Sequence, residues 1–136
     1  MFQKSLRLRV YPRGFHLITD EIEEALNVCS IQNGIVHIFI KHTSASLTIN
    51  ENADPSVRTD METFFSDVAD DKQYFIHTYE GSDDMPAHLK ASLLGSSVTI
   101  PLTNGRLNLG MWQGVYLGEH RDHSGSREIV ITVMGE

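Results

Sequence analysis

The alternation of hydrophobic and polar residues along the chain predicts a fold rich in β-strands. Apolar residues occupy every second position from Ser5 to Val10, which indicates a strand with one buried face. The segment from Ile35 to His42 is apolar on both faces, as is typical of a central, buried strand, and it ends at His42. Further strands are expected over residues 16–18, 73–79, 97–102, 107–109, 115–119 and 128–133.

Apolar residues at helical spacing predict three helices among these strands. The first follows Asp20, and the second has Asp54 as its N-cap and Pro55 at its first position. The third runs from about residue 86 to residue 94 and ends at Gly95. Because the last third of the chain is helix-free and dense in turns, we expect an α+β fold with mostly antiparallel sheets, in a single domain over residues 1–136.

Composition narrows the classes of protein to be considered. The 136 residues carry a formal net charge of −7 with no basic stripe, which argues against a nucleic-acid partner. No apolar run approaches the roughly 20 residues of a membrane span, so no membrane segment is expected. The single cysteine, Cys29, has no partner for an internal disulfide, which agrees with the cytoplasm as the expected location.

The richest candidate chemistry lies in the polar junction between the strand that ends at His42 and the helix that begins at Pro55. It reads HTSASLTINENADP and combines imidazole, hydroxyl and carboxylate groups. Each of these residues taken alone is more simply explained by hydrogen bonding in a turn, but such groups gathered at one junction are typical of a functional site. The candidates in this segment are His42, Thr43, Ser44, Glu51 and Asp54.

The seven histidines suggest a metal site, because five of them fall at the ends of elements or in loops. No pair shows the HExxH pattern, so a divalent cation, Mg²⁺ or Zn²⁺, would need ligands from distant segments. His77 and His88 flank several acids near the start of the third helix and form the second candidate cluster. The candidate metal ligands are therefore His42, His77 and His88.

Two further pairs of residues suggest contacts to a substrate. Arg121 and Arg127 bracket the loop HRDHSGS and are candidate anion contacts, with surface ion pairing as the alternative. Trp112 and Gln113 stand at a strand entrance, where an aromatic plane beside an amide could hold a flat heterocycle, although a packing role is more common for tryptophan.

Four motifs resemble the YjbQ family, described as secondary thiamine-phosphate synthases, over nearly the whole chain. They are HTSASLTINENADPSV (42–57), HTYEGSDDMPAHLKASLLGSS (77–97), IPLTNGRLNLGMWQGVYLGEHRD (100–122) and GSREIVITV (125–133). The resemblance implies a small α+β protein with two packed sheets that assembles as a homotrimer. It also implies the joining of aminopyrimidine methyl diphosphate to thiazole phosphate, with release of diphosphate, as a main or a side activity.

The resemblance assigns roles residue by residue. His42 and His88 would transfer protons or bind a metal, while Glu51 and Asp54 would orient them or a Mg²⁺ ion. The residues expected to contact the phosphorylated substrate are Thr43, Ser44, Trp112, Gln113, Glu119, Arg121 and Arg127. Three positions depart from the family pattern in ways that affect anion binding: Met111, Asp84 and Glu128.

Two other functions remain open from the sequence. The same histidines and acids would suit a metal-dependent hydrolase acting on a different phosphorylated or heterocyclic substrate. A non-catalytic trimer that binds a small metabolite is the alternative from another class.

Overall fold

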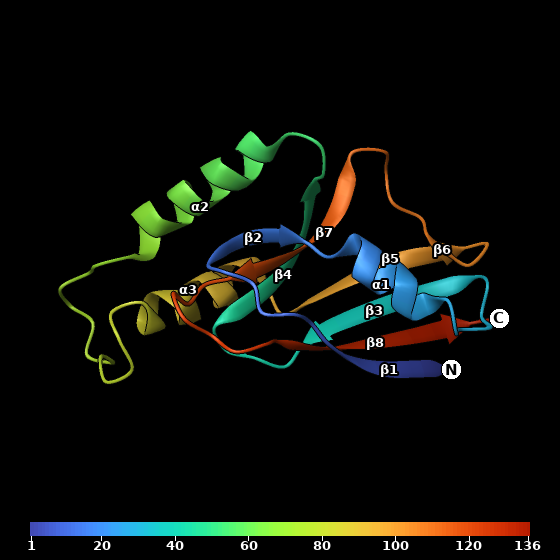
Figure 1. The fold of residues 1–136 in the computed structure, drawn as a ribbon, viewed down its shortest axis with the longest axis horizontal. Coiled ribbons are helices and arrows are strands. Elements are labelled where there is room, and N and C mark those ends of the chain that lie inside the picture. The colour runs from blue at the N-terminus through green and yellow to red at the C-terminus, as the bar shows by residue number, and fades with distance from the viewer.

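The computed structural model describes all 136 residues as eight strands and three helices (Figure 1). The helices are α1 (Thr19–Leu26), α2 (Pro55–Ala69) and α3 (Asp84–Leu94). The strands are β1 (Phe2–Arg7), β2 (Gly14–Leu17), β3 (Gly34–Ile40), β4 (Ala45–Glu51), β5 (Ser97–Thr103), β6 (Arg106–Leu107), β7 (Gln113–Glu119) and β8 (Glu128–Gly135).

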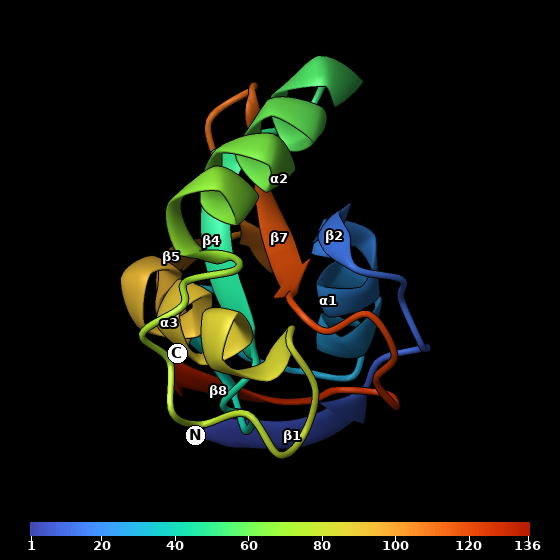
Figure 2. The ribbon, with the colours of Figure 1, turned by 90° about the vertical axis from the view of Figure 1, so that its left-hand side faces the viewer.

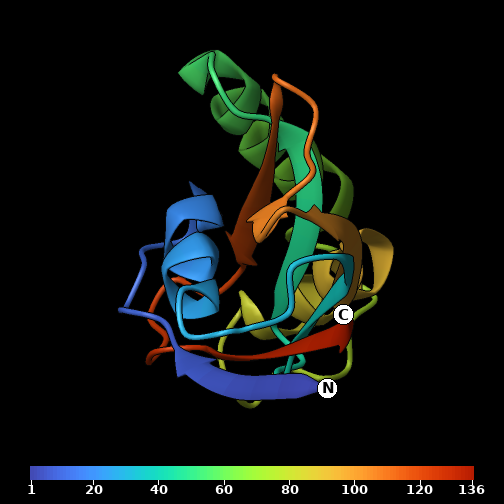
Figure 3. The ribbon, with the colours of Figure 1, turned by 90° about the vertical axis from the view of Figure 1, so that its right-hand side faces the viewer.

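The strands form two antiparallel sheets that pack on each other. The larger has the order β1-β8-β3-β5-β6 and the smaller β2-β7-β4. Figures 2 and 3 show the upright strands of the smaller sheet crossing the larger sheet at a steep angle. Between them lies a core that includes Ile38, Leu47 and Ile131, all fully buried. The expected α+β fold with mostly antiparallel sheets and three helices is confirmed.

Strand β3 is central, as predicted, but only one of its faces is buried within the chain. It pairs with β5 on one side and β8 on the other. Val36, Ile38 and Ile40 face the core, whereas Ile35 and Phe39 are 52% and 42% exposed. The expectation of burial on both faces is wrong for the single chain, because the second sheet covers only one face of the larger sheet.

The segment from Ala45 to Glu51 is strand β4, which the sequence analysis took for a polar junction. The sequence pattern does not indicate this strand, because Ser46 within it and Ser44 just before it are polar but buried. Ser46 Oγ lies 2.8 Å from His120 Nε2, so its hydroxyl group is satisfied inside the protein. A strand of seven residues with a rise of about 3.3 Å per residue separates its two ends by roughly 20 Å.

Residues 73–79 do not form the predicted strand. They belong to the irregular segment between α2 and α3, in which Tyr74, Ile76 and Tyr79 are exposed. No strand lies beside this segment, so its alternating apolar residues do not lead to β-sheet hydrogen bonds. The first strand is also shifted, since it ends at Arg7 and leaves Val10 exposed.

The helices begin close to where the sequence placed them. Asp54 caps α2, because its Oδ1 accepts a hydrogen bond of 2.9 Å from the Ser56 backbone N–H, and Pro55 is the first helical residue. Helix α3 begins at Asp84, two residues before the predicted start. None of the three helices is long and apolar enough to cross a bilayer.

A buried histidine lies between the sheets and the helices. His120 is 1% exposed, and the only hydrogen bond of its ring is the one to Ser46. Burial, followed by the charge of nearby Lys90, lowers the pKa of His120 to about 3. The imidazole is therefore neutral at pH 7.

The low pKa of His120 predicts a loss of stability in mild acid. Between pH of about 6.5 and about 3 the unfolded chain binds a proton at this site and the folded chain does not, so the free energy of unfolding should fall as pH decreases. The contribution approaches about 1.4 kcal/mol per pH unit. Urea unfolding at several pH values should show a shallower decrease in His120→Gln, which keeps a partner for Ser46. An identical decrease in both proteins would contradict the assignment.

Candidate functional site

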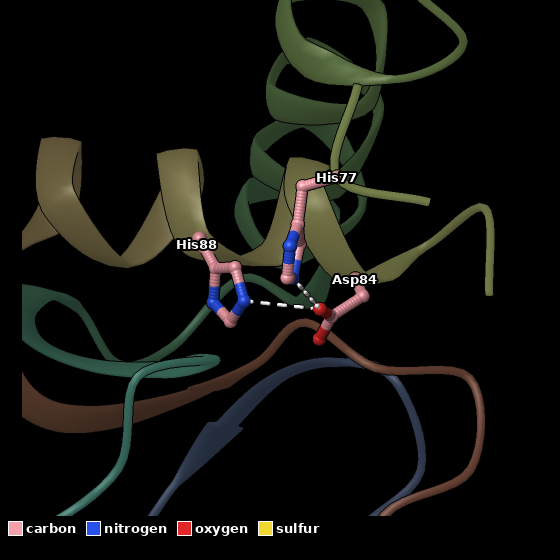
Figure 4. Close-up of side chains that lie close together, drawn as sticks. All are labelled: His77, Asp84 and His88. Atoms are coloured by element: carbon pink, nitrogen blue, oxygen red, sulfur yellow. Dashed lines mark hydrogen bonds and ion pairs between the residues drawn. The ribbon is translucent and has the colours of Figure 1, made fainter. Parts of the chain in front are cut away.

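Three side chains that can bind a metal meet beside the start of α3 (Figure 4). His77 comes from the segment after α2, and Asp84 and His88 come from α3. Asp84 Oδ2 lies 2.8 Å from His77 Nε2 and 3.0 Å from His88 Nε2. One ligand atom from each residue lies within 4.8 Å of the others. We call this group the His77–Asp84–His88 cluster.

Local structure explains how distant residues meet here. Asp84 and His88 are four residues apart on a helix and therefore share one face. His77 approaches them because the segment after α2 folds back, and its start is fastened by Asp70. The two carboxylate oxygens of Asp70 lie 2.6 Å from Arg13 Nη2 and 2.9 Å from the buried Lys90 Nζ.

Arg121 holds Asp84 in place from the other side. Its Nη1 donates to Asp84 Oδ1 at 2.8 Å, and its Nε donates to Asp83 Oδ2 at 2.9 Å. The hydrogen bond to Asp83 raises the pKa of Arg121 above its usual value. Arg121 Nη2 also donates to the Glu80 carbonyl, at 2.7 Å. With its donors engaged in this way, Arg121 orients a candidate metal ligand instead of acting as the expected anion contact.

The hydrogen bond of the other ring nitrogen defines the tautomer of His88. Nδ1 lies 2.9 Å from the backbone oxygen of Thr43. A carbonyl oxygen only accepts, so Nδ1 carries the hydrogen. In the neutral ring, Nε2 then points a lone pair at a carboxylate oxygen of Asp84, which is 3.0 Å away. Two acceptors at this distance repel each other unless a proton or a metal cation lies between them.

The donor set fits a divalent transition-type cation. Two imidazole nitrogens and one carboxylate oxygen, with a fourth position open, are typical of catalytic zinc sites, whereas Mg²⁺ prefers oxygen ligands. Two of the ligands also have the outer partners that metal-binding residues usually have, namely the Thr43 carbonyl for His88 and Arg121 for Asp84. The buried position of Asp84, which is 1% exposed, keeps its oxygens out of bulk water.

His42 lies near this cluster but does not join it. Its Nε2 accepts a hydrogen bond of 2.8 Å from the Glu128 backbone N–H, so the ring carries its hydrogen on Nδ1. Burial, followed by the positive charges of Arg127 and Arg7, lowers the pKa of His42. His42 is thus a neutral hydrogen-bond donor, and Asp84 takes the place that the sequence analysis gave to His42 among the metal ligands.

A surface groove joins His42 to the cluster. Its first hollow, of about 460 Å³, is lined by Phe39, Ile40, Lys41, His42, Thr43, Ser44, Ser96 and Arg127. Its second hollow, of about 320 Å³, is lined by His42, Thr43, His88, Ala91, Ser92, Gly95 and Ser96. The hollows share His42, Thr43 and Ser96, so they form one groove. The structure therefore brings His42, His88, Thr43 and Ser44 together, as the sequence analysis expected.

Glu51 and Asp54 lie at the far end of β4 and make local contacts. Glu51 Oε2 accepts a hydrogen bond of 2.9 Å from the Asp54 backbone N–H, and Asp54 caps α2. The backbone hydrogen bond from Ser56 lowers the pKa of Asp54. The expected role of these acids in orienting His42 and His88 is not met within one chain, because β4 is an extended strand between them.

Trp112 and Gln113 also lie at this far end. Gln113 pairs with Glu51 across β4 and β7, and its side chain accepts a hydrogen bond from the Gly110 N–H. Trp112 is 61% exposed. Neither residue lines the groove of its own chain.

Glu119 and Arg127 form a buried ion pair beneath the groove. Arg127 Nη2 and Nε donate to the two oxygens of Glu119 at 2.6 and 2.7 Å. Burial alone would raise the pKa of Glu119, but the hydrogen bonds from Arg127 and Ser124 outweigh it and hold the pKa below its usual value. Glu119 is fully buried and turned toward Arg127, so we assign it to the fold and not to substrate contact. Arg127 still lines the first hollow.

Asp84 is one of the acids of the second candidate cluster and one of the departures from the family pattern, but the sequence did not single it out as a metal ligand. The signal was present in the sequence, since Asp84 and His88 have the four-residue spacing that places two ligands on one face of a helix. The backbone oxygen of Thr43 gave no such signal.

The chain is a small two-sheet α+β protein in which two histidines and one aspartate meet, and their donor atoms are close enough together that they could hold a metal ion. The family model described as UPF0047 protein YjbQ-like matches residues 4–136, and the chain belongs to this family. The UPF0047 protein YjbQ of Salmonella typhimurium is 52% identical over 136 residues, with 99% of each chain covered. The UPF0047 protein YugU of Bacillus subtilis is 38% identical and covers 97% of this chain and 98% of its own.

Solved structures show the same fold. A YbjQ-like protein of unknown function from Sulfolobus solfataricus matches with a TM-score of 0.88 at 26% identity, covering 99% of this chain and 97% of its own. A conserved hypothetical protein from Thermus thermophilus matches with a TM-score of 0.86 at 34% identity, covering 96% of this chain and 99% of its own. The names of these relatives specify no activity.

Proposed function

We propose that the protein is a metal-dependent enzyme that acts on a small phosphorylated substrate in the groove beside the His77–Asp84–His88 cluster. The observation that carries this proposal is the convergence of two imidazole nitrogens, His77 Nε2 and His88 Nε2, on one oxygen of Asp84 at 2.8 and 3.0 Å. These three residues would hold a divalent cation.

The residues of the chain have distinct roles in this proposal. His77, Asp84 and His88 would hold the cation, which would supply a Lewis acid for a substrate oxygen. Arg121 keeps Asp84 oriented toward the two imidazoles. The Thr43 carbonyl holds the ring of His88, and His42 donates its Nδ1–H into the groove.

The specific reaction we propose to test first is the formation of thiamine phosphate, which the family resemblance suggests. Departure of diphosphate from the methylene carbon of the aminopyrimidine leaves a resonance-stabilised cation. Catalysis then consists mainly of neutralising the leaving oxygens and holding the thiazole nitrogen in line. A divalent cation next to hydroxyl and N–H donors supports the first of these tasks.

Hydrolysis of a phosphorylated small molecule is the second candidate. Two histidines and one carboxylate with an open fourth position favour it, because metal sites of this kind commonly serve hydrolysis. The two reactions differ in what the protein consumes, since hydrolysis needs one phosphorylated substrate and the synthase needs two.

A rescue test separates these functions. The wild-type chain is expressed in a host that lacks its ordinary thiamine-phosphate synthase, beside His77→Ala and His88→Ala. Growth with wild type but with neither variant is the result expected for the synthase. The matched control is His123→Ala, which removes an exposed histidine without side-chain hydrogen bonds and should grow as wild type does.

The other results are equally informative. Equal growth with all four proteins would contradict the site assignment. If none supports growth while the purified protein, loaded with Zn²⁺, releases phosphate from phosphate esters, hydrolysis replaces the synthase. A wild-type protein with neither activity would favour the non-catalytic metabolite-binding trimer.

We also propose that the chain assembles as a homotrimer, as the resemblance implies. Large apolar side chains are exposed at two separate places, with Ile76 and Tyr79 near the cluster and Met111 and Trp112 at the far end of β4. Different exposed patches on one chain suit head-to-tail contacts, which close into rings. Sedimentation equilibrium would measure the number of chains, and a monomer would contradict this proposal.

A further inference from the structure

We propose that the first hollow of the groove, at the segment His42–Ser44, binds the phosphate group of a small phosphate ester whose uncharged part lies against the end of α3. This assignment deepens the proposed function by defining which end of the substrate lies where. The binding of phosphate itself does not require the metal.

Free backbone donors are the first observation behind this inference. The amides of His42, Thr43 and Ser44 have no hydrogen-bond acceptor within the protein. All three residues line the first hollow. The carbonyl groups of Thr43 and Ser44, in contrast, are engaged by His88, His120 and Arg127. Consecutive N–H groups without partners are the usual material of an anion-binding concavity.

The side chain of His42 adds a donor of defined state. Because its Nε2 accepts from the Glu128 backbone N–H at 2.8 Å, its hydrogen is on Nδ1, and the residue lines both hollows. A neutral imidazole in this state donates a hydrogen bond from Nδ1 to a phosphate oxygen. It does not act as a base toward the phosphate. The hydroxyl groups of Thr43, Ser44 and Ser96 line the same hollow and provide further donors.

The charges around the first hollow leave a positive excess, although the whole chain has a net charge of −7. Arg127 is balanced by Glu119. Glu128 contacts two cations, with Arg7 at 3.2 Å and Lys41 at 3.7 Å. Three cations therefore face two carboxylates. Glu128 departs from the family pattern by adding a negative charge. In this arrangement the added charge does not abolish anion binding, because the one carboxylate faces both Arg7 and Lys41.

The second hollow has the opposite polarity. It is lined by Ala91, Ser92 and Gly95, at the carboxyl end of α3. Carbonyl groups without helical partners at such an end carry partial negative charge and disfavour an anion. Without a bound cation, the polarity of the groove therefore orients a phosphate ester with its phosphate toward Lys41 and its uncharged part beside His88.

The test is a titration of the full-length protein, stripped of metal with a chelator, with inorganic phosphate, diphosphate and methyl phosphate. Amide chemical shifts in a ¹⁵N–¹H spectrum report the binding site, and calorimetry reports the affinity. We expect saturable binding that shifts the amide signals of Thr43 and Ser44. Tighter binding of methyl phosphate than of inorganic phosphate would indicate an ester, and the reverse order would overturn the assignment to an ester.

Two variants test the residues without breaking the fold. Lys41→Met removes a half-exposed charge, and His42→Gln keeps an acceptor for the Glu128 N–H while removing the Nδ1–H donor. Each should weaken phosphate binding by about tenfold, the usual effect of losing a hydrogen bond to a charged group. Lys4→Met is the matched control, because it removes the same charge from an exposed site on β1, and it should leave binding unchanged. Arg127 is avoided, since its removal would leave Glu119 buried without a partner.

The outcomes separate this inference from the proposed function. Wild-type affinity in both Lys41→Met and His42→Gln, or signal changes confined to another surface, would overturn the phosphate site. Intact phosphate binding in His77→Ala supports it as a site separate from the metal ligands. Phosphate binding in a protein that binds no divalent metal would contradict the proposed function and still support this site.

Discussion

Asp84→Asn is expected to weaken Zn²⁺ binding by at least about 100-fold, because it removes the only anionic ligand of the cluster. The carboxylate of Asp84 contacts both imidazoles and Arg121. Asparagine keeps the size and one oxygen that can still accept from Arg121, so the local fold should persist. The NH2 group that replaces the second oxygen is a hydrogen-bond donor and does not bind a metal.

Two measurements check this expectation. Competition with a chromophoric chelator gives the affinity, and thermal unfolding gives the stabilisation by metal, which is about 2.7 kcal/mol at a free Zn²⁺ concentration of 100 times Kd. Asp84→Asn should show no such stabilisation. Asp60→Asn is the matched control, because it neutralises an exposed aspartate of α2 without side-chain hydrogen bonds or ion pairs. Wild-type affinity in Asp84→Asn would remove the metal site from the proposal.

Glu119→Gln is expected to destabilise the fold by about 3–5 kcal/mol, the usual cost of breaking a buried ion pair from one side. Glu119 is fully buried and accepts two hydrogen bonds from Arg127. In the variant, the new amide group directs its N–H groups toward those of the guanidinium. The charge of Arg127 then stays in the interior without its counterion.

Urea unfolding at pH 7 and equal chain concentration measures this loss. Glu62→Gln is the control, because Glu62 pairs with Arg13 at a partly exposed site and should cost less than about 1 kcal/mol. The double variant Glu119→Leu with Arg127→Met should recover part of the loss, since neither charge is then left alone. A loss below about 1 kcal/mol in Glu119→Gln would mean that water or another residue compensates Arg127.

Local sequence is sufficient to predict where a helix begins and which of its faces is buried. Asp54 and Pro55 mark the start of α2 correctly, because a cap and a first-turn proline act within four residues. The apolar residues Ile22, Ala25 and Leu26 of α1 are buried, since helical spacing alone places them on one face. Strand β4 was missed because its residue Ser46 is polar but buried, and the partner of that side chain, His120, lies far along the chain.

The candidate site was predictable only in part for the same reason. His42, Thr43, Ser44 and His88 do share a groove. Glu51 and Asp54 are close to His42 in sequence but lie at the other end of an extended strand. Conversely, Arg121 is 37 residues from Asp84 in sequence and contacts it directly.

The sequence by itself determined the α+β class, the helix starts and the stock of imidazole, hydroxyl and carboxylate groups, because these depend on neighbours within a few residues. Only the tertiary structure decided which of those groups meet. The fold-back of the segment after α2 brings His77 to α3, and the Thr43 carbonyl selects the tautomer of His88. Contacts of this kind depend on how distant segments pack, which no local pattern of residues records.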